Sequence, residues 1–276
     1  MKILFETGRQ FVISSIAVLA GMALSAGDVT AQTYDAVKAR GEVIIGVQGD
    51  NPPFGFLNST GKNDGFDIKV AALFGEFLGM PVEFQVVTNQ NRIATLQTGK
   101  VDVLFATLGM SAERAQSLQY SQPYAANVMQ VVAKKSMQIS GPADLTGVRL
   151  GTPKGSTQDI VLSEIAPDAN FLRFDDDSST IQALLSGQVD AVGGSQFYIS
   201  RLEELSPGVY EDKFPIKTNY NGAGMILGDK EWNEAVNAFL LQIKENGQLA
   251  ELYRKWMNLD PPEWPASLEG IPFTVE

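Results

Sequence analysis

Apolar and polar positions follow a repeating order along the first half of the chain. Apolar runs at 42–47, 82–87 and 101–106 have the length of buried strands. Between the first two runs, apolar residues recur at helical spacing after Asp67, whose side chain is the expected cap of that helix. A second helix is predicted to start at Asn89. This βαβαβ order predicts a parallel sheet with helices on its faces.

The same order returns in the second half. Strands are predicted at 148–151, 170–174 and 189–192, and helices at 158–165 and 175–187. Residues of one helix–glycine–strand unit also recur with a constant offset. Ile93, Leu96, Gly99, Val101 and Asp102 correspond to Ile181, Leu184, Gly187, Val189 and Asp190. The repetition predicts two lobes built by the same rule, and it favours a structural role for the two aspartates.

Two extended segments, near 125–132 and 220–226, lie where the chain would pass into a second lobe and return. The predicted fold class is therefore α/β, with two lobes of mainly parallel sheet flanked by helices and joined by two extended hinge strands. A cleft between hinged lobes is a common place for a ligand. The expected boundaries are residues 32–127 and 224–276 for lobe 1, and 128–223 for lobe 2.

Composition narrows the function. The formal net charge of −11 argues against nucleic acid or anionic lipid as a partner. The chain has no histidine and no cysteine, which excludes disulfides and Ser-His-Asp or Cys-His hydrolases. It also removes the commonest zinc ligands, so no metal and no cofactor is expected.

The first 31 residues have the pattern of a secretory signal peptide. An apolar run at 11–26 follows a short basic start, and small residues end at Ala31, where cleavage is expected. The run is too short for a comfortable membrane span. No cysteine follows the expected cut, so no lipid anchor is predicted. These features favour an unanchored protein of a Gram-negative periplasm, which we expect to be a monomer.

The stretch 99–124 carries the first candidate binding residue. A strand leads into a loop of small residues at 107–111, and Ser111 is a good helix cap, which places Arg114 in the first turn of a predicted helix. Helix N-termini already carry partial positive charge, so N–H groups and a guanidinium would together form an anion site. The alternative is a surface ion pair of Arg114 with Glu113 or a distant acid.

Seven short motifs occur along the expected mature chain. They are GFD at 65–67, NRI..L..GKVD at 91–102, ER....YS.PY at 113–124, DL.G at 144–147, KGS at 154–156, G.VDA at 187–191 and ENG....LY.KW at 245–256. In order and spacing they resemble the periplasmic polar amino-acid-binding proteins of ATP-binding-cassette (ABC) importers, family 3 of the bacterial solute-binding proteins. The resemblance implies a type II periplasmic-binding fold whose lobes close on a solute. It also implies inner-membrane permease subunits as partners.

The resemblance assigns roles to residues of the two loops. Arg114 would hold the α-carboxylate of an amino acid. Backbone groups of Thr107 and Gly109 would contact the carboxylate and the amino group. Ser156 and Thr157 of the second lobe would add N–H groups, so that one carboxylate lies between two helix starts.

Four positions depart from the family pattern. Ser195 stands where many members carry an acid that pairs with the ligand's ammonium, and a hydroxyl cannot supply that ion pair. Either another acid substitutes or the ligand's nitrogen is not a free primary amine. The acidic run 175–177 is interpreted as a solvated helix cap, with supply of this counter-charge as the alternative. Asn51 and Asn89 replace side-chain-gripping aromatics, and Gly109 replaces a threonine, which removes a hydroxyl or makes room for a larger ligand.

Arg92 and Gln48 bear on the ligand's side chain. In members that bind acidic amino acids, an arginine in a QNRI stretch reaches the second carboxylate; the alternative is that Arg92 is a solvated first-turn residue. Gln48 stands where some of those members carry another cation. The predicted function is capture of a small polar amino acid, or an amino-acid-like carboxylate, for an ABC importer, without catalysis. The alternative is an enzyme resembling a cyclohexadienyl (prephenate or arogenate) dehydratase, which needs a general acid in the cleft.

Overall fold

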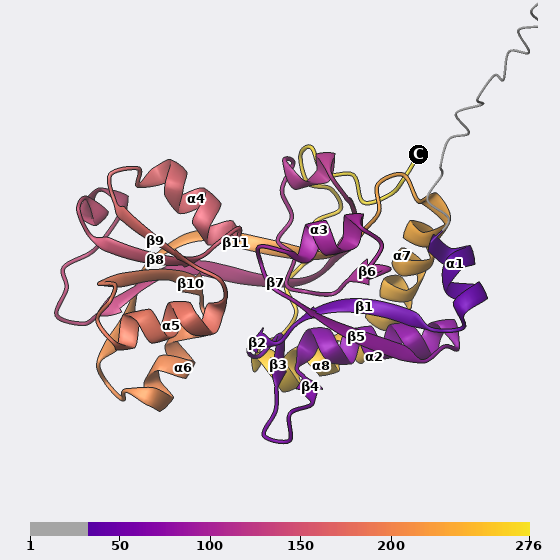
Figure 1. Cartoon of the computed structure of the whole chain (residues 1–276), viewed down its shortest axis with the longest axis horizontal. Coiled ribbons are helices and arrows are strands. Elements are labelled where there is room, and N and C mark those ends of the chain that lie inside the picture. The colour runs from indigo at the N-terminus through magenta and orange to yellow at the C-terminus, as the bar shows by residue number, and fades with distance from the viewer. Residues whose placement is uncertain (1–32) are drawn as a thin grey trace, which may run out of the picture.

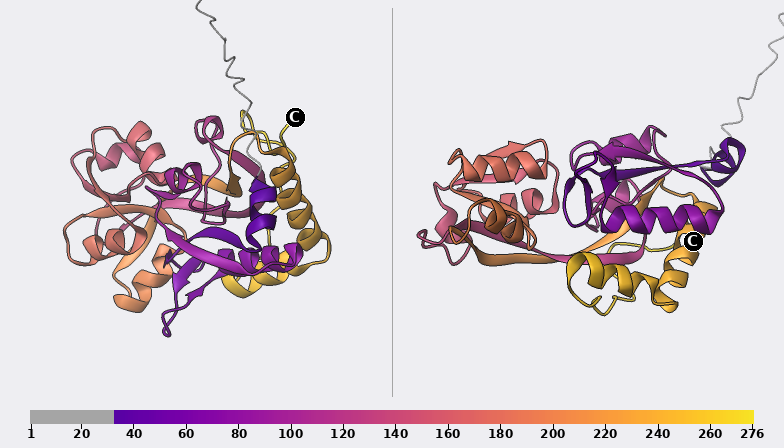
Figure 2. Two further views of the ribbon diagram at one scale, coloured as in Figure 1. Left: turned by 45° about the vertical axis from the view of Figure 1, so that its right-hand side comes forward. Right: turned by 90° about the horizontal axis from the view of Figure 1, so that it is seen from below.

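The computed structural model describes residues 33–276. The expected signal peptide and its cleavage after Ala31 lie outside these residues. Figure 1 shows two lobes side by side, joined by the long strands β7 (Gln119–Lys134) and β11 (Tyr210–Met225). Seen from below in Figure 2, these two antiparallel strands run together from one lobe to the other. The predicted α/β class with two lobes is confirmed, whereas the exact lobe boundaries within these strands stay a prediction.

One eight-stranded sheet runs through the described part of both lobes, in the order β5-β1-β6-β11-β7-β10-β8-β9. Its shorter strands are β1 (Val43–Gln48), β5 (Val82–Val87), β6 (Val103–Leu104), β8 (Arg149–Pro153), β9 (Asn170–Phe174) and β10 (Ala191–Ser195). β1 pairs in parallel with β5 and β6, and β8 pairs in parallel with β9 and β10. The parallel order predicted for each half of the chain is therefore confirmed.

The helices divide between the lobes. The first lobe holds α1 (Thr33–Arg40), α2 (Phe66–Leu78), α3 (Arg92–Gln97), α7 (Lys230–Glu245) and α8 (Gln248–Met257), and the second holds α4 (Thr157–Ile165), α5 (Asp177–Leu185) and α6 (Tyr198–Leu205). Between residues 33 and 276, no helix has the length and apolar character that a bilayer span needs.

A small second sheet borders the cleft and was not predicted from the pattern. It consists of β2 (Asp50–Asn51), β3 (Gly55–Leu57) and β4 (Asn63–Asp64), paired antiparallel. Strands of two or three residues carry no measurable alternation, so periodicity cannot reveal them. This sheet places Asp50 and Asn51 beside the second lobe.

Each lobe has its own apolar core. In the first lobe, Phe74 packs its ring against Trp232 and Phe239, with centroids 5.4 and 5.2 Å apart. In the second lobe, Leu162 of α4 and Leu202 of α6 are fully buried in separate clusters. Phe197 of the second lobe also packs against the first core, with its ring 5.6 Å from that of Phe54, so most but not all of the core packing lies within one lobe.

The repeated aspartates have the same structural role in both lobes. The Asp102 carboxylate accepts the N–H of Ile44 (2.7 Å) and pairs with Arg40. The Asp190 carboxylate accepts the N–H of Arg149 (3.2 Å) and pairs with its guanidinium (2.6 Å). Each aspartate thus fixes the start of the neighbouring parallel strand, as the repeat predicts.

Two predicted helix starts are wrong. Arg114 opens only a three-residue 3-10 turn, Arg114–Gln116, although the Ser111 hydroxyl does accept the Arg114 N–H (3.2 Å). A single turn lacks the macrodipole on which the predicted anion site at Arg114 depends. The cap of α2 is Gly65, whereas Asp67 lies inside the helix and makes no capping bond. A serine or aspartate signal cannot by itself tell a helix from a turn.

Candidate ligand-binding cleft

A small closed cavity lies between the lobes. The first lobe contributes Asn51, Asn89, Arg92 and Thr107, the long strand β7 contributes Asn127 and Met129, and the second lobe contributes Thr157, Gln158, Asp177 and Ser195. Its volume of about 10 Å³ is close to that of one water site. The lobes are therefore closed on one another, and six of the predicted site residues meet at the cavity. These six are Asn51, Asn89, Arg92, Thr107, Thr157 and Ser195.

Arg114 bridges the lobes through hydrogen bonds. Its Nη1 donates to the Gly109 carbonyl (2.7 Å) and to the Thr157 hydroxyl (3.3 Å), and its Nη2 donates to the Gly155 carbonyl (2.9 Å). The residue is only 7% exposed, and it takes part in no ion pair found in the described chain. The surface ion pair with Glu113 is therefore wrong, and the guanidinium faces neutral acceptors of both lobes.

The glycine loop of the second lobe leads into a true helix. Ser156 caps α4, because its hydroxyl accepts the Asp159 N–H (3.2 Å). Its own N–H donates to the Pro153 carbonyl (3.2 Å), so it is already used inside the loop. The loop thus presents Thr157, at the first turn of α4, to the cavity. The start of α4 thus faces the site from the second lobe, whereas the Arg114 loop supplies a 3-10 turn in place of the second helix start that the resemblance implied.

A buried carboxylate holds the loop of the first lobe. Asp67 is fully buried, and its Oδ2 accepts both the N–H (2.7 Å) and the hydroxyl (3.1 Å) of Thr107. Its Oδ1 accepts the Tyr124 hydroxyl (3.0 Å). Thr107 has a φ of 49°, a left-handed conformation that costs about 1 kcal/mol or more for a β-branched residue. Burial raises the pKa of Asp67 to about 6, and the three donors oppose that rise. Asp67 is therefore a positioning residue for the site loop, a role that its sequence context did not reveal.

Arg92 lies beneath the same loop. It is 1% exposed, and its Nη1 donates to the carbonyls of Ala106 (2.7 Å) and Thr107 (3.3 Å). Burial, reinforced by the charge of Arg114, lowers the pKa of Arg92 to about 9. The interpretation as a solvated first-turn residue is wrong. Contact between Arg92 and a second carboxylate of the ligand stays a prediction.

Among the described residues that line the cavity, Asp177 is the one with a carboxyl group. It is 2% exposed and accepts hydrogen bonds from the Tyr198 hydroxyl and, across the lobes, from Asn89 Nδ2 (2.9 Å). Burial raises its pKa. The cap of α5 is its neighbour Asp176, which accepts the Ser179 N–H (2.7 Å). The acidic run is therefore not uniformly a solvated cap, because one of its three carboxylates faces the cleft.

Asp50 connects the lobes at the edge of the cleft. Its carboxylate accepts the N–H groups of Asp177 (2.8 Å) and Ser178 (3.1 Å) at the start of α5, and its carbonyl accepts from Arg201 (3.2 Å). Burial and the negative charge of Asp177 raise the pKa of Asp50 to about 6. From the sequence, the segment around Asp50 is predicted only to be an irregular loop.

Several buried amides of the cleft have unused hydrogen-bonding groups. Asn51 donates to Gln48 Oε1 (3.2 Å), while Asn51 Oδ1 and Gln48 Nε2 have no partner within the described residues. Asn127 is 3% exposed, and neither its Oδ1 nor its Nδ2 has a partner there. Gln48 is buried behind Asn51 and does not itself line the cavity.

Gly109 lies where the two loops touch. A Cβ at this position would come within 2.4 Å of both Thr157 Oγ1 and Asn219 Nδ2. The space of a threonine side chain is therefore filled by these two residues in the closed form. Of the two explanations for this glycine, the structure favours a tight contact between loops over room for a larger ligand.

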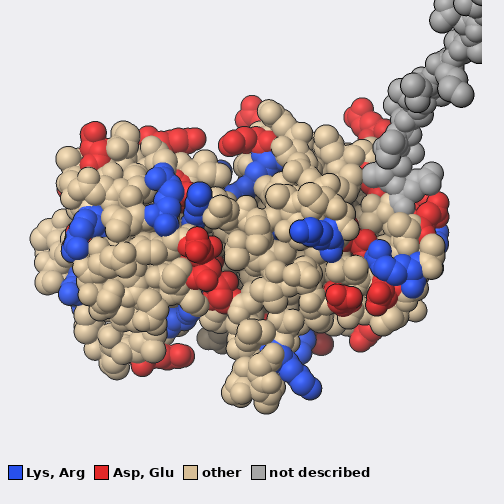
Figure 3. Space-filling model, viewed as in Figure 1, with Lys and Arg blue, Asp and Glu red and all other residues tan. Residues whose placement is uncertain are grey.

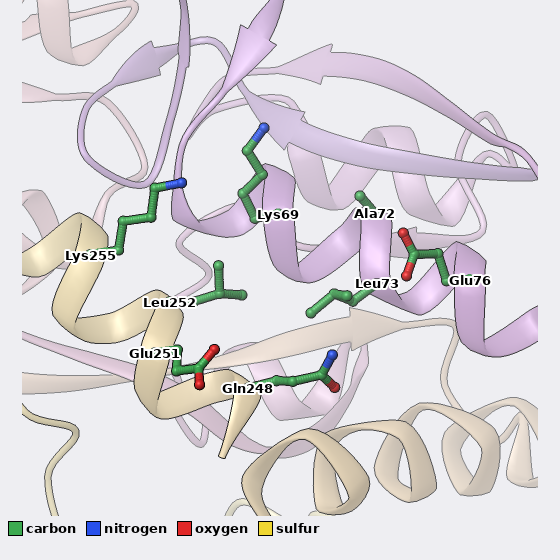
Figure 4. A pocket seen from close by; sticks show the side chains of 8 residues that line it. All are labelled: Lys69, Ala72, Leu73, Glu76, Gln248, Glu251, Leu252 and Lys255. Atoms are coloured by element: carbon green, nitrogen blue, oxygen red, sulfur yellow. The ribbon is translucent and has the colours of Figure 1, made fainter. Parts of the chain in front are cut away.

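A groove of about 370 Å³ lies outside the cleft, on the first lobe. Figure 4 shows its side chains coming from α2 and α8: Lys69, Ala72, Leu73, Glu76, Gln248, Glu251, Leu252 and Lys255. It contains none of the predicted site residues. Over the face shown in Figure 3, acidic and basic side chains are interspersed, without one large patch of either sign.

Comparison with known proteins agrees with this geometry. The glutamine-binding protein GlnH of an ABC transporter of Bacillus subtilis (strain 168) is 30% identical, over 84% of this chain and 86% of the relative. The L-cystine-binding protein TcyJ of Escherichia coli (strain K12) is 26% identical, over 93% and 98%. A solved structure, the ancestral amino acid-binding protein AncCDT-1, described as a precursor of cyclohexadienyl dehydratase, is 29% identical with a TM-score of 0.75, over 81% and 99%.

A family model matches most of the described chain. It covers residues 43–259, from the first strand of the first lobe to the end of its last helix. The match includes every residue that lines the cleft. The chain therefore belongs to family 3 of the bacterial extracellular solute-binding proteins.

Proposed function

We propose that this protein is a periplasmic receptor that binds a small polar amino acid, or an amino-acid-like carboxylate, and delivers it to the permease of an ABC importer. The relatives named for glutamine and L-cystine binding support this class of ligand. The observation that carries the proposal is the position of Arg114, whose guanidinium donates to backbone carbonyls of both lobes.

A carboxylate is the natural partner of this guanidinium. Charge-assisted hydrogen bonds to a carboxylate are about twice as strong as those to neutral carbonyls. A ligand carboxylate would therefore replace the Gly109 and Gly155 carbonyls as acceptor. The first turn of α4, with Thr157, would add N–H groups from the second lobe. These contacts exist together only when the lobes are closed, which is the differential affinity that a ligand-driven closure requires.

The small volume of the closed cavity also implies that opening of the lobes precedes ligand binding. A volume of about 10 Å³ cannot admit an amino acid, so the lobes must open before the ligand enters. The paired strands β7 and β11 connect the lobes and are the segments about which they can turn. Binding is then coupled to a change of shape, which a permease can recognise.

The test is stabilisation by ligand. Wild-type protein is screened by thermal unfolding against amino acids, dipeptides, opines and dicarboxylates. A ligand at about a hundred times its dissociation constant should stabilise the fold by about 2.7 kcal/mol. If no compound raises the melting temperature, the proposed function is wrong.

Arg114→Ala and Arg114→Lys locate the carboxylate. Alanine should abolish the thermal shift, and lysine should retain only part of it, because an ammonium cannot form the two-pronged contact of a guanidinium. Arg254→Ala, at an arginine with a 61% exposed side chain on α8, is the matched control and should bind as wild type does. Unchanged affinity of Arg114→Ala would remove Arg114 from the site.

The enzymatic alternative needs a general acid, and Asp177 is the carboxyl group that lines the described cavity. We propose that the protein does not catalyse a reaction. Incubation with prephenate or arogenate tests this, because formation of an aromatic product would establish a dehydratase.

A further inference from the structure

The residues that line the described cavity have unpaired acceptors as well as unpaired donors, and they include one carboxylate. Asn51 Oδ1 and Asn127 Oδ1 are buried and have no donor within the described residues. Asp177 lines the same cavity as both asparagines. A ligand group that satisfies these oxygen atoms must bring N–H or O–H donors.

The Asp177 carboxylate has no ion-pair partner in the described chain. Its two hydrogen bonds come from the neutral groups of Tyr198 and Asn89. A carboxylate has about four acceptor directions, so two remain. The two arginines whose charges act on the pKa of Asp177 donate elsewhere: Arg201 donates to the Asp50 carbonyl and the Ser178 hydroxyl, and Arg92 donates to backbone carbonyls. A buried carboxylate without a direct cationic partner is costly, and a cation of the ligand would offset that cost.

Ser195 does not fill this role. Its hydroxyl lines the cavity but is engaged by the Phe197 N–H (3.3 Å) and carries no charge. Asp50 also faces the start of α5, yet it does not line the cavity, and its carboxylate is occupied by two backbone N–H groups. Asp177 is thus the carboxylate that can pair with a cation of the ligand.

We propose that Asp177 is the counter-charge for a protonated nitrogen of the ligand, with the amide oxygens of Asn51 and Asn127 as further acceptors. This inference rests on the proposed function and sharpens it, because it makes the ligand a zwitterion. The nitrogen is either the α-ammonium or a cationic side chain. Dicarboxylates without a nitrogen are poor ligands.

The placement of the two charges couples recognition to closure. Arg114 follows β6 in the first lobe, and Asp177 begins α5 in the second. A zwitterion therefore contacts opposite charges on the two lobes. Its cation also reduces the repulsion between Asp177 and Asp50, which exists only while the lobes are closed. Both effects favour the closed form over the open form.

The experiment compares Asp177→Asn with wild type by isothermal titration calorimetry. The probes are L-glutamine, L-arginine and L-cystine, each beside its N-acetyl derivative. Asparagine removes the charge, keeps one oxygen to accept from Asn89, and presents an amide N–H that the Tyr198 hydroxyl can accept, so both neighbours retain a hydrogen-bond partner. We expect at least a tenfold loss of affinity for the amino acid that wild type binds. Asp175→Asn, at an exposed residue of the same run, is the matched control and should bind as wild type does.

Two further measurements identify the nitrogen and guard against misfolding. If wild type loses affinity for the N-acetyl probe, the α-ammonium is the partner of Asp177; if N-acetyl-L-arginine binds as L-arginine does, the side chain is. Adding Ser195→Asp to Asp177→Asn should recover part of the lost affinity, because it restores a carboxylate to the same cavity.

The outcomes separate this inference from the proposed function. Binding of an amino acid by wild type, together with affinity within twofold for Asp177→Asn, overturns the role of Asp177 and leaves the receptor function standing. If wild type binds L-glutamine or L-cystine and has equal affinity for its N-acetyl derivative, which carries no cation, the role of Asp177 is also overturned. Absence of any binding by wild type is instead a failure of the proposed function.

Discussion

Asp50→Asn tests which of two opposite electrostatic effects of the Asp50 carboxylate on the stability of the closed form is larger. As a carboxylate at the start of α5, Asp50 interacts favourably with the helix dipole, an effect of about 0.3–1 kcal/mol and at most about 2 kcal/mol. As a buried carboxylate beside Asp177, it is destabilising while charged. Asparagine keeps an oxygen for the two N–H groups and removes the charge, so the variant shows which effect is larger.

The pKa gives the size of the difference. Raising the pKa of Asp50 from 3.8 to about 6 corresponds to about 3 kcal/mol at neutral pH. Discounted for the residue's remaining solvent contact, about 1–2 kcal/mol is expected. Because the pKa is higher in the folded protein than in the unfolded chain, protonation stabilises the fold. That stabilisation is fully present below pH 3.8 and is lost as the pH rises through about 6.

Asp50→Asn should therefore be more stable than wild type by about 1–2 kcal/mol at pH 7.5, and the difference should fall towards zero near pH 4. Urea unfolding followed by tryptophan fluorescence at several pH values measures this, with Asp175→Asn as the exposed-carboxylate control. If Asp50→Asn is less stable than wild type at pH 7.5 and equal to it at pH 4, the charged cap dominates and the reasoning is wrong.

Three other substitutions test the loop of the first lobe. Gly109→Ala should lower ligand affinity at least tenfold and increase the radius of gyration in X-ray scattering, since its Cβ would lie 2.4 Å from Thr157 Oγ1; an unchanged radius and affinity would contradict the closed contact. Asp67→Ala leaves the Thr107 N–H and the Tyr124 hydroxyl without their acceptor, so urea unfolding should show a loss of about 2–4 kcal/mol. Tyr124→Phe removes a single donor and should cost about 1 kcal/mol; equal stability of the two variants would refute the role of Asp67.

The pattern of apolar residues predicts the sheet because it records burial within each lobe. Strands at 82–87 and 170–174 were predicted to the residue, since each is bounded by clear turn signals. The three strands of the small sheet carry too few residues for periodicity. The predicted helix at Arg114 is wrong because Ser111 caps a turn as readily as a helix, and the Arg114 side chain is hydrogen-bonded to the second lobe.

The binding site could be predicted only in part. That Arg114 and a glycine loop far along the chain belong to one site was implied by the resemblance to a known family. The burial of Asp177 did not, because it depends on Asn89 in the other lobe and on Tyr198 in a helix that was not predicted. In the local sequence, nothing distinguishes Asp177 from its capping neighbour Asp176. Interlobe contacts have no local signal, so a sequence reveals them only through resemblance.

The unpaired amides explain why closure should depend on the whole ligand. In the closed cleft, each buried polar atom without a partner costs about 1–3 kcal/mol, and Asn127 alone has two. A carboxylate by itself provides acceptors for Arg114, but it leaves Asn127 Oδ1 without a donor and Asp177 without a cationic partner. A protonated nitrogen by itself leaves Arg114 on its neutral carbonyls. Only a molecule that carries both groups at a suitable separation removes both costs, and the receptor thereby rejects partial ligands by the groups that they leave unpaired rather than by shape.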